Sequence, residues 1–316
     1  MDVVLTEDIV VLLNSIEKKL GKLESEIVID LHLRKENKIK SIHSSLAIEQ
    51  NSLSIEQVTA IIEGERVLGV AIEIQEVKNA FEIYEQFNQL NPYSQQDLLY
   101  AHKILTKEII ASSGSYRNND VGIFTDTGKV VHMGARPDFI YNLMTDLFTK
   151  LSESRLSPVI KACIFHYELE LIHPFADGNG RMGRLWQNLI LSKYSPVFEF
   201  LTIETLIYEH QEEYYAVLQE SDETGEASHF AEFMLDLINS TLSEFTHSRI
   251  IELNQSELDA YNQLLEYLKQ EKRITTSNFA KLIDKAPATS RRYMNKYAKL
   301  NLLESHGQNK DRFYTL

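Results

Sequence analysis

Apolar residues recur at the three- and four-residue spacing of an α-helix along most of this chain. Only six prolines and twelve glycines interrupt that pattern in 316 residues, so the backbone has few places to turn sharply. Residues 79–110 form two amphipathic stretches that separate near Asn91-Pro92, and the helical pattern resumes over residues 138–245. The sequence therefore predicts a mainly α-helical fold.

Two local patterns mark where an element begins or turns. Ser54 and Gln57 have the spacing of a capping box, which predicts that a helix starts directly after Ser54. Residues 120–134 depart from the helical pattern, because short β-prone runs flank Thr127-Gly128. This segment is predicted to be a β-hairpin.

The composition limits what the chain binds. A formal net charge of −14 argues against binding of the whole chain to nucleic acid or an anionic membrane, although a local basic patch is compatible with it. The single cysteine, Cys163, excludes an internal disulfide and a cysteine-rich zinc site, and its apolar neighbours predict burial. The first 13 residues carry acids where a signal peptide needs basic residues, and their apolar run is too short to cross a bilayer. We expect a cytoplasmic protein with no membrane partner.

Residues 251–316 differ in charge from the rest of the chain. They carry 11 basic and 8 acidic side chains, whereas the 250 residues before them carry 21 basic and 38 acidic. Three helical patterns, at residues 256–271, 275–284 and 287–300, precede two strand-like runs that flank Gly307-Gln308-Asn309-Lys310. Three helices followed by a hairpin is the order of a winged helix, so a separate C-terminal module is predicted.

The third of these helices has two interpretations. Its basic side chains, Arg291, Arg292, Lys296 and Lys299, can meet DNA phosphates as a recognition helix does. Tyr293, Tyr297 and Leu300 must also pack, and an excess of three positive charges is modest. A structural or protein-docking role is therefore the alternative to DNA contact.

The segment His173–Arg184, with the sequence HPFADGNGRMGR, lies between two helical patterns and predicts a helix–loop–helix. A glycine-rich loop that enters a helix presents backbone N–H groups and a partial positive charge to a phosphate. Arg181 and Arg184 add planar donors for phosphate oxygens. Asp177 offers a hard oxygen ligand for Mg²⁺, and His173 titrates near neutral pH and can take a proton from a hydroxyl. Each feature alone is commonplace, but together within twelve residues they predict a nucleotide-phosphate site.

This segment resembles the signature of the Fic family, H-x-F-x-[DE]-G-N-G-R-x-x-R, at every specified position. The resemblance implies a helical core that transfers AMP from ATP to a protein hydroxyl, with Mg²⁺ bound beside ATP. It implies that His173 is the general base, that Asp177 binds Mg²⁺ and that Phe175 anchors the loop. The implied catalytic set is His173, Asp177, Asn179, Arg181 and Arg184, and the implied phosphate-binding set is Gly178, Asn179, Gly180, Arg181, Met182, Gly183 and Arg184.

The predicted hairpin occupies the place of the flap that docks the target segment in this family. The residues implied to dock the target by strand addition are Val121, Gly122, Ile123, Val130, Val131 and His132. Gly114-Ser115-Tyr116-Arg117 also resembles the family's lead-in to the flap.

A second match lies upstream, where Ser45-Leu46-Ala47-Ile48-Glu49-Gln50 resembles the family's inhibitory motif, [ST]-x-x-x-E-[GN]. Ser45 and Glu49 are four residues apart and share a helix face. Gln50 stands where the motif has Gly or Asn. The resemblance implies that Glu49 pairs with Arg184 and occupies the clamp for the γ-phosphate.

Downstream, residues 207–215 resemble the family's helix that ends in Tyr-Tyr and lines the nucleotide base. By position, His210 and Tyr214 are implied to contact the nucleotide, although His210 stands where relatives often carry Asn. The alternative is that Tyr214 and Tyr215 are ordinary core aromatics.

These observations predict three parts: an N-terminal helical region at residues 1–95 with an inhibitory helix near 40–51, a catalytic core at 96–248 and a winged-helix-like module at 249–316. The predicted activity is that of a protein adenylyltransferase restrained by Glu49, acting on a Ser, Thr or Tyr of an unknown target, with a homodimer plausible. The alternatives are removal of AMP with the help of Glu49, a DNA-associated regulator that senses nucleotide, and transfer of a different phosphate-containing group.

Overall fold

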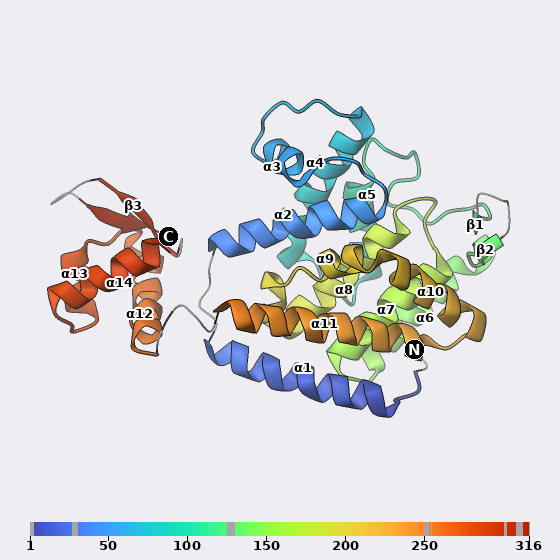
Figure 1. Cartoon of the computed structure of the whole chain (residues 1–316). Helices are drawn as coiled ribbons and strands as arrows, with labels where there is room; N and C mark the ends of the chain where they lie inside the picture. The colour runs from blue at the N-terminus through green and yellow to red at the C-terminus, as the bar shows by residue number, and fades with distance from the viewer. Residues whose placement is uncertain are drawn as a thin grey trace. The chain divides into compact units, whose positions relative to one another are not determined.

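The structure is a computed structural model that describes residues 3–26, 31–124, 130–249, 253, 255–299, 302–307 and 312–315. Helices dominate the described chain, and its strands form two small antiparallel hairpins. The predicted mainly α-helical fold is confirmed (Figure 1).

Contacts between residues divide the chain into two compact units. One comprises Met1–Gly21 with Asn37–Ser243, and the other Lys22–Glu36 with Glu244–Leu316. The predicted division into three parts, with boundaries after residues 95 and 248, stays a prediction.

The larger unit is built mostly from helices that the apolar periodicity predicts. In chain order its elements, some of which continue into the other unit, are α1 (Glu7–Glu26), α2 (Leu31–Ile48), α3 (Ile55–Ile62), α4 (Ala71–Gln86), the 3₁₀ turn Phe87–Gln89, α5 (Gln95–Leu105), β1 (Gly122–Phe124), β2 (Val130–Met133), α6 (Pro137–Glu153), α7 (Pro158–Ile172), α8 (Asn179–Tyr194), the 3₁₀ turn Pro196–Phe200, α9 (Ile203–Glu209), α10 (Gln211–Thr224) and α11 (Ala227–Arg249).

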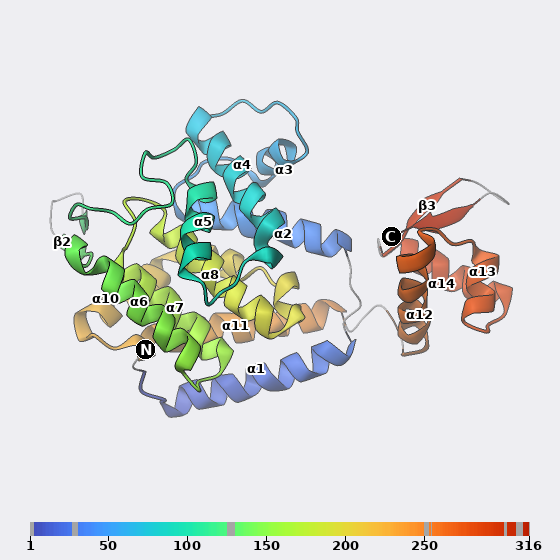
Figure 2. The same cartoon turned by 180° about the vertical axis from the view of Figure 1, so that it is seen from behind.

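Helices α7 and α8 form the centre of this unit (Figures 1 and 2). Buried side chains project from all sides of α7, which is the pattern of a helix enclosed by others. On α8, Trp186 is fully buried against Phe148 and Phe165, and its indole N–H donates to the carbonyl of Pro92 at 3.0 Å. The loop between α7 and α8 therefore starts and ends on well-packed elements.

The first and last helices of this unit, α1 and α11, are far apart in the sequence but lie side by side in both views (Figures 1 and 2). Ser15 donates to Asn239 Oδ1 at 2.8 Å, and Lys19 Nζ donates to the Asn239 carbonyl at 2.9 Å. Sequence periodicity cannot predict such pairings, because it shows only that each helix has an apolar face.

Several local predictions are confirmed. Helix α3 begins with a capping box in which Ser54 and Gln57 bond to each other's backbone. The two amphipathic stretches are α4 and α5, separated at residues 87–94. Cys163 is fully buried, and burial raises the pKa of its thiol to about 12.

The predicted hairpin is present, with Gly122 opposite Met133 and Ile123 opposite His132. The register shifts between Ile123 and Phe124. The predicted turn at Thr127-Gly128 lies outside the described residues.

The smaller unit contains α12 (Gln255–Glu271), α13 (Thr276–Leu282), α14 (Pro287–Lys299), β3 (Glu304–His306) and β4 (Phe313–Thr315). Strands β3 and β4 are antiparallel, and Ile274 forms an additional bridge with Tyr314. The core contains Tyr261, Phe279 and Tyr297. The order of helices and strands agrees with the sequence prediction, whereas most of the predicted turn at 307–310 lies outside the described residues. Its identity as a winged helix stays a prediction.

Within the described part of the chain, no helix combines the length and the apolar character that are needed to cross a bilayer.

Candidate active site

The loop after α7 opens with an uncommon backbone conformation. His173 has φ 51° and ψ 58°, in the left-handed region that few non-glycine residues adopt, and its N–H caps α7 by donating to Leu169 O at 2.9 Å. The chain therefore turns away from the helix directly at His173. Such backbone conformations often occur at functional sites, where surrounding contacts hold them in place.

Arg117 holds this turn from the side of the hairpin. Its buried guanidinium donates to four backbone carbonyls, those of His173 at 2.7 Å, Asn119 at 2.7 Å, Ala135 at 2.5 Å and Ile172 at 3.5 Å. A Cβ at Gly134 would lie 2.6 Å from Arg117 Nη2, so glycine is required for this approach. Burial lowers the pKa of Arg117, and the carbonyl oxygens replace the water that it loses. Arg117, the last residue of the predicted lead-in to the flap, thus fixes the end of α7 relative to both hairpin strands.

Asn179 and Phe175 close the loop on itself. The Asn179 side chain accepts from the Phe175 N–H and donates to the Phe175 carbonyl, both at 2.9 Å. The Phe175 ring is fully buried and stacks on His102 of α5, with the ring centroids 3.8 Å apart. These contacts agree with the anchoring role predicted for Phe175.

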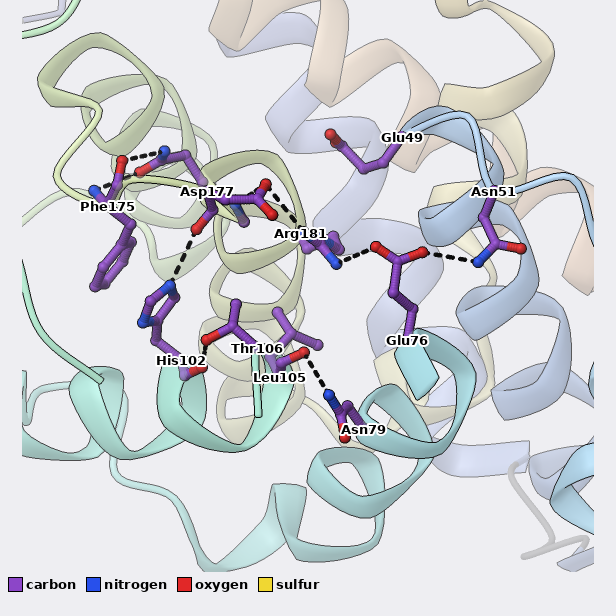
Figure 3. A network of polar contacts seen from close by, with 12 residues as sticks. Glu49, Asn51, Glu76, Asn79, His102, Leu105, Thr106, Phe175, Asp177 and Arg181 are labelled. Carbon is purple, nitrogen blue, oxygen red and sulfur yellow. Dashed lines mark hydrogen bonds and ion pairs between the residues drawn. The ribbon is translucent and has the colours of Figure 1, made fainter. Parts of the chain in front are cut away.

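His102 also supports the peptide of Asp177, as Figure 3 shows. His102 Nδ1 accepts from the Gly114 N–H at 2.9 Å, so the proton is on Nε2, which donates to the Asp177 carbonyl at 3.0 Å. Burial lowers the pKa of His102 to about 4, which keeps the imidazole neutral with this distribution of protons. The sequence analysis did not identify His102, because it lies about 70 residues from the loop and belongs to no recognisable motif.

The first turn of α8 is built to receive an anion. Gly178, with φ 86°, precedes α8, and the N–H groups of a first helical turn have no carbonyl partner within the helix. A Cβ at Gly180 would overlap Glu49 Oε1. The glycine therefore lets an oxygen approach the backbone closely, and the Glu49 carboxylate takes that place here.

Arg184 is the most buried cation at the site and forms the ion pair that the sequence predicts. Its Nη2 donates to Glu49 Oε1 at 2.7 Å, and it also donates to Ser45 Oγ at 3.1 Å and to the Ser45 carbonyl at 2.9 Å. Burial is the largest single influence and would lower the pKa of Arg184, but the combined effects of Glu49, Tyr214 and Glu170 outweigh it, so the pKa is raised. Ser45 and Glu49 of the upstream motif therefore both bind the Arg184 guanidinium.

The end of α2 explains why the family motif has Gly or Asn where this chain has Gln50. Gln50 has φ 67°, its N–H donates to Ala47 O at 3.0 Å, and the Asn51 N–H donates to Leu46 O at 3.1 Å. This is a Schellman motif, whose left-handed residue is usually glycine or asparagine. The same turn places Glu49 beside Arg184.

Arg181 has different partners. Its Nη1 donates to Glu76 Oε1 of α4 at 2.8 Å, and its Nη2 donates to Asp177 Oδ1 at 3.1 Å (Figure 3). Arg181 is buried and does not contribute to the lining of the cavity described next. Glu76 was not identified from the sequence, because its position on α4 shows no pattern that sets it apart from other acidic residues.

A cavity of about 700 Å³ opens beside the loop. Its lining includes residues from the upstream motif, the loop and α10: Glu49, His173, Asp177, Gly178, Asn179, Gly180, Arg184, Gln211, Tyr214 and Tyr215. The proposed base, the proposed metal ligand and one arginine thus share a single concave surface. A cavity of this size can hold a nucleotide-sized ligand.

Another carboxylate, that of Glu170 on α7, also belongs to the lining of the cavity. Its Oε1 is 3.9 Å from His166 Nε2 and would lie 3.1 Å from a Cβ at Gly183. Burial, together with the nearby negative charge of Glu49, raises the pKa of Glu170 to about 8, although Arg184 acts in the opposite direction. The Glu170 carboxyl is therefore largely protonated at neutral pH.

The segment expected to line the nucleotide base differs in detail from the prediction. The chain breaks at His210 between α9 and α10, so Tyr214 and Tyr215 begin a helix rather than end one. Tyr214 is buried and its hydroxyl lies 3.0 Å from His166 Nε2, while the His210 side chain is half exposed and does not contribute to the lining. Gln211 and Tyr215 donate to the Ile48 carbonyl at 3.0 and 3.4 Å and so attach α10 to the end of α2.

The six hairpin residues predicted to dock a target fall on or beside β1 and β2. Val121 accepts from the Gly134 N–H at 3.1 Å, Gly122 and Ile123 belong to β1, and Val130, Val131 and His132 belong to β2.

Comparison with known proteins agrees with this geometry. The sequence model of the Fic/DOC family matches residues 92–191, from the turn before α5 into α8. A Fic family protein from Desulfovibrio desulfuricans G20 has a similar structure, with a TM-score of 0.74 and 36% sequence identity over 99% of this chain and 97% of that one.

Curated relatives match over shorter portions. Protein adenylyltransferase fic-1 from Caenorhabditis elegans is 31% identical over 193 residues, which are 56% of this chain and 35% of the relative. Protein adenylyltransferase Fic from Culex quinquefasciatus is 29% identical over 248 residues, which are 72% of this chain and 46% of the relative. The chain thus spans about a third to a half of the length of these curated relatives.

Proposed function

Because the chain belongs to the Fic/DOC family, we propose that it transfers AMP from ATP to a hydroxyl side chain of a protein. The observation that carries this proposal is the shared cavity, which is lined by His173, Asp177, Arg184 and the N-terminal turn of α8. Protein adenylyltransferases among the relatives support the same activity.

In the proposed reaction the target hydroxyl oxygen attacks the α-phosphorus of ATP in line, and pyrophosphate leaves. His173 accepts the hydroxyl proton. The turn Gly178-Asn179-Gly180 and the following residues, Met182 and Gly183 among them, hold the α- and β-phosphates at the start of α8. Arg184 is proposed to stabilise the outer phosphates directly. Arg181 is proposed to stabilise them indirectly, because it orients the Asp177 carboxylate that would hold Mg²⁺. Tyr214, which lines the cavity, is the proposed contact to the nucleoside. His210, which does not line the cavity, is proposed from family resemblance alone. Catalysis of this kind depends on positioning and charge stabilisation.

Asp177 is the residue that would hold Mg²⁺. Within the described chain, no three His, Cys, Asp or Glu side chains gather into a metal site, so a bound ion would take its other ligands from phosphate and water. That donor set suits Mg²⁺, which usually binds one or two carboxylates together with substrate phosphates. The Asp177 carboxylate fits this role, since it is half exposed and lines the cavity. When bound, Mg²⁺ would neutralise phosphate charge.

We further propose that Glu49 restrains the reaction by occupying the place of a γ-phosphate oxygen on Arg184. A carboxylate resembles a phosphate in charge and in its fit to a guanidinium, so the two compete for one partner. The same carboxylate, beside the cavity, is also suitably placed to orient a water for removal of AMP from a modified protein. Removal of AMP is therefore the second candidate activity.

The target would dock by strand addition to the hairpin at Val121–Ile123 and Val130–His132, whose backbone can pair with an extended segment. The small unit is proposed to contact DNA or a protein through α14. Arg291 and Arg292 are exposed there, whereas Lys296 forms an ion pair with the buried Glu257. A homodimer is also proposed, from family resemblance alone.

The proposal is tested by incubating the protein and its Glu49→Gly variant with Mg²⁺ and ATP labelled at the α- or the γ-phosphate. Labelling of protein from the α position only indicates AMP transfer, and labelling from the γ position indicates a kinase-like reaction. His173→Ala in the Glu49→Gly background should lower transfer by about 10²–10⁴-fold and leave ATP binding nearly intact. The control is His229→Ala, which changes a half-exposed histidine on α11. Full activity without His173 would contradict its role as the base.

A further inference from the structure

Both arginines of the segment His173–Arg184, which lie in the first turns of α8, are held by carboxylates from outside that segment. Glu49 holds Arg184, and Glu76 of α4 holds Arg181 at 2.8 Å. The Arg181 side chain is 4% exposed and that of Glu76 is 16% exposed, so this second ion pair is shielded from water. Pairs of that kind are strongly affected when one partner is removed, because the other charge stays buried.

Arg181 transmits this restraint to Asp177. One oxygen of the Asp177 carboxylate, Oδ1, accepts from Arg181 Nη2 at 3.1 Å and from the Gly178 N–H at 2.6 Å. These two bonds orient the carboxyl group and direct its other oxygen away from them. Partners of metal ligands affect metal affinity in this way, through the orientation of the ligand.

The same Glu76 carboxylate also binds the turn that presents Glu49. Asn51 Nδ2 donates to Glu76 Oε2 at 2.8 Å and to the Glu73 carbonyl at 3.2 Å (Figure 3). Asn51 follows Glu49 by two residues, and the backbone bonds of the Schellman motif join them in one rigid turn. This turn therefore contacts Arg184 directly, through Glu49. It is also linked to Arg181, because Asn51 binds the Glu76 carboxylate that holds Arg181.

We propose that Glu76 is a positioning residue with two duties: through Arg181 it orients the Asp177 carboxylate toward a nucleotide-bound Mg²⁺, and through Asn51 it anchors the Glu49 turn. This inference rests on the proposed function, since it assumes that Mg²⁺ and ATP bind in the cavity. Glu76 itself does not contribute to the cavity lining, so its effect on a ligand must pass through Arg181 and Asp177.

The first duty is tested by binding without turnover, in the Glu49→Gly/His173→Ala protein. Calorimetry measures the dissociation constant of ATP with Mg²⁺ and with EDTA, before and after Glu76→Gln. We expect Glu76→Gln to reduce the Mg²⁺-dependent gain in ATP affinity by about tenfold or more, and not to reduce the affinity in EDTA. Glu82→Gln is the matched control, because Glu82 lies on the same helix and pairs only with the exposed Lys107 among the described ion pairs.

The outcomes separate this inference from the proposed function. A Glu76→Gln protein that keeps the full Mg²⁺-dependent gain, or that loses affinity equally in EDTA, would overturn the positioning role alone. If the starting protein binds no ATP under either condition, the proposed function fails and the inference fails with it.

The second duty is tested by self-modification. Asn51→Ala should raise the activity of the parent protein by about tenfold, because the Glu49 turn loses its anchor. This factor corresponds to the free energy of one hydrogen bond to a charged group. The same change should not raise the activity of the Glu49→Gly protein, in which the restraining carboxylate is already gone. An equal rise in both proteins, or no rise in the parent, would overturn the anchoring role.

Discussion

Glu49 Oε1 lies 2.7 Å from Arg184 Nη2, although the two residues are 135 positions apart in the sequence. The Arg184 side chain is almost fully buried, whereas the Glu49 side chain is 30% exposed at the cavity. The cation is therefore a fixed part of the core, and the carboxylate sits at the edge, where a ligand can replace it. A phosphate oxygen is a suitable replacement because it offers the same charge-assisted hydrogen bonds.

Removing the carboxylate should activate the protein. Glu49→Gly should raise self-modification by about 10- to 100-fold, which corresponds to one charge-assisted hydrogen bond. Adding Arg184→Ala should cancel the gain, because the freed clamp no longer exists. Incorporation of α-labelled ATP measures both effects. Glu153→Gly, an acidic residue at the exposed end of α6, is the control for a glycine at a helix terminus. A Glu49→Gly protein no more active than the parent would contradict autoinhibition.

Gln50 should be replaceable by glycine with a gain in stability. A non-glycine residue in the left-handed conformation costs roughly 1–2 kcal/mol, and part of the relief is offset because glycine is more flexible in the unfolded chain. We expect the free energy of unfolding to rise by up to about 1 kcal/mol, as measured by denaturant titration. Gln50→Ala should give no such gain, because alanine keeps the Cβ atom. Equal stability of the glycine and alanine variants would show that the backbone at this position is not strained.

The neutral imidazole of His102 should make folding sensitive to acid. Its pKa is lowered by burial from about 6.5 to about 4, so between these values the unfolded chain binds a proton that the folded chain does not. Stability is then lost as the pH falls from 6.5 toward 4. His102→Phe should make the unfolding free energy less dependent on pH in this window, by about 1.4 kcal/mol per pH unit at most. His229→Phe, at a half-exposed histidine, should leave the slope unchanged. A slope that His102→Phe leaves unaltered would contradict this account.

DNA contact through α14 should depend strongly on salt. If Arg291 and Arg292 bind phosphates, changing both to alanine should reduce the slope of log affinity against log salt by about two. Gel-shift titration of the full chain at several salt concentrations measures this slope. Lys150→Ala with Arg155→Ala removes the same charge from exposed positions in the larger unit and serves as the control. Absence of any shift at low salt would favour the protein-docking alternative.

The secondary-structure elements and the contiguous part of the site follow from local sequence patterns. Helical periodicity, the Ser54 capping box and the loop His173–Arg184 are local, since each depends on residues within a few turns of one another. The pairing of Glu49 with Arg184 was also predictable, but only because both lie in motifs of one family. Periodicity alone carries no information about which helix faces meet.

The distant side chains that support the loop could not be identified without knowing how the helices pack. His102, Arg117 and Glu76 come from elements that precede it by 56 to 105 residues, and each acts by filling a hydrogen bond that a loop atom requires. An acidic residue on an amphipathic helix looks the same in sequence whether it faces water or a buried arginine. The packing of α4 and α5 against α8 makes that distinction, because it removes water from one side of each helix and leaves its polar groups to bind one another.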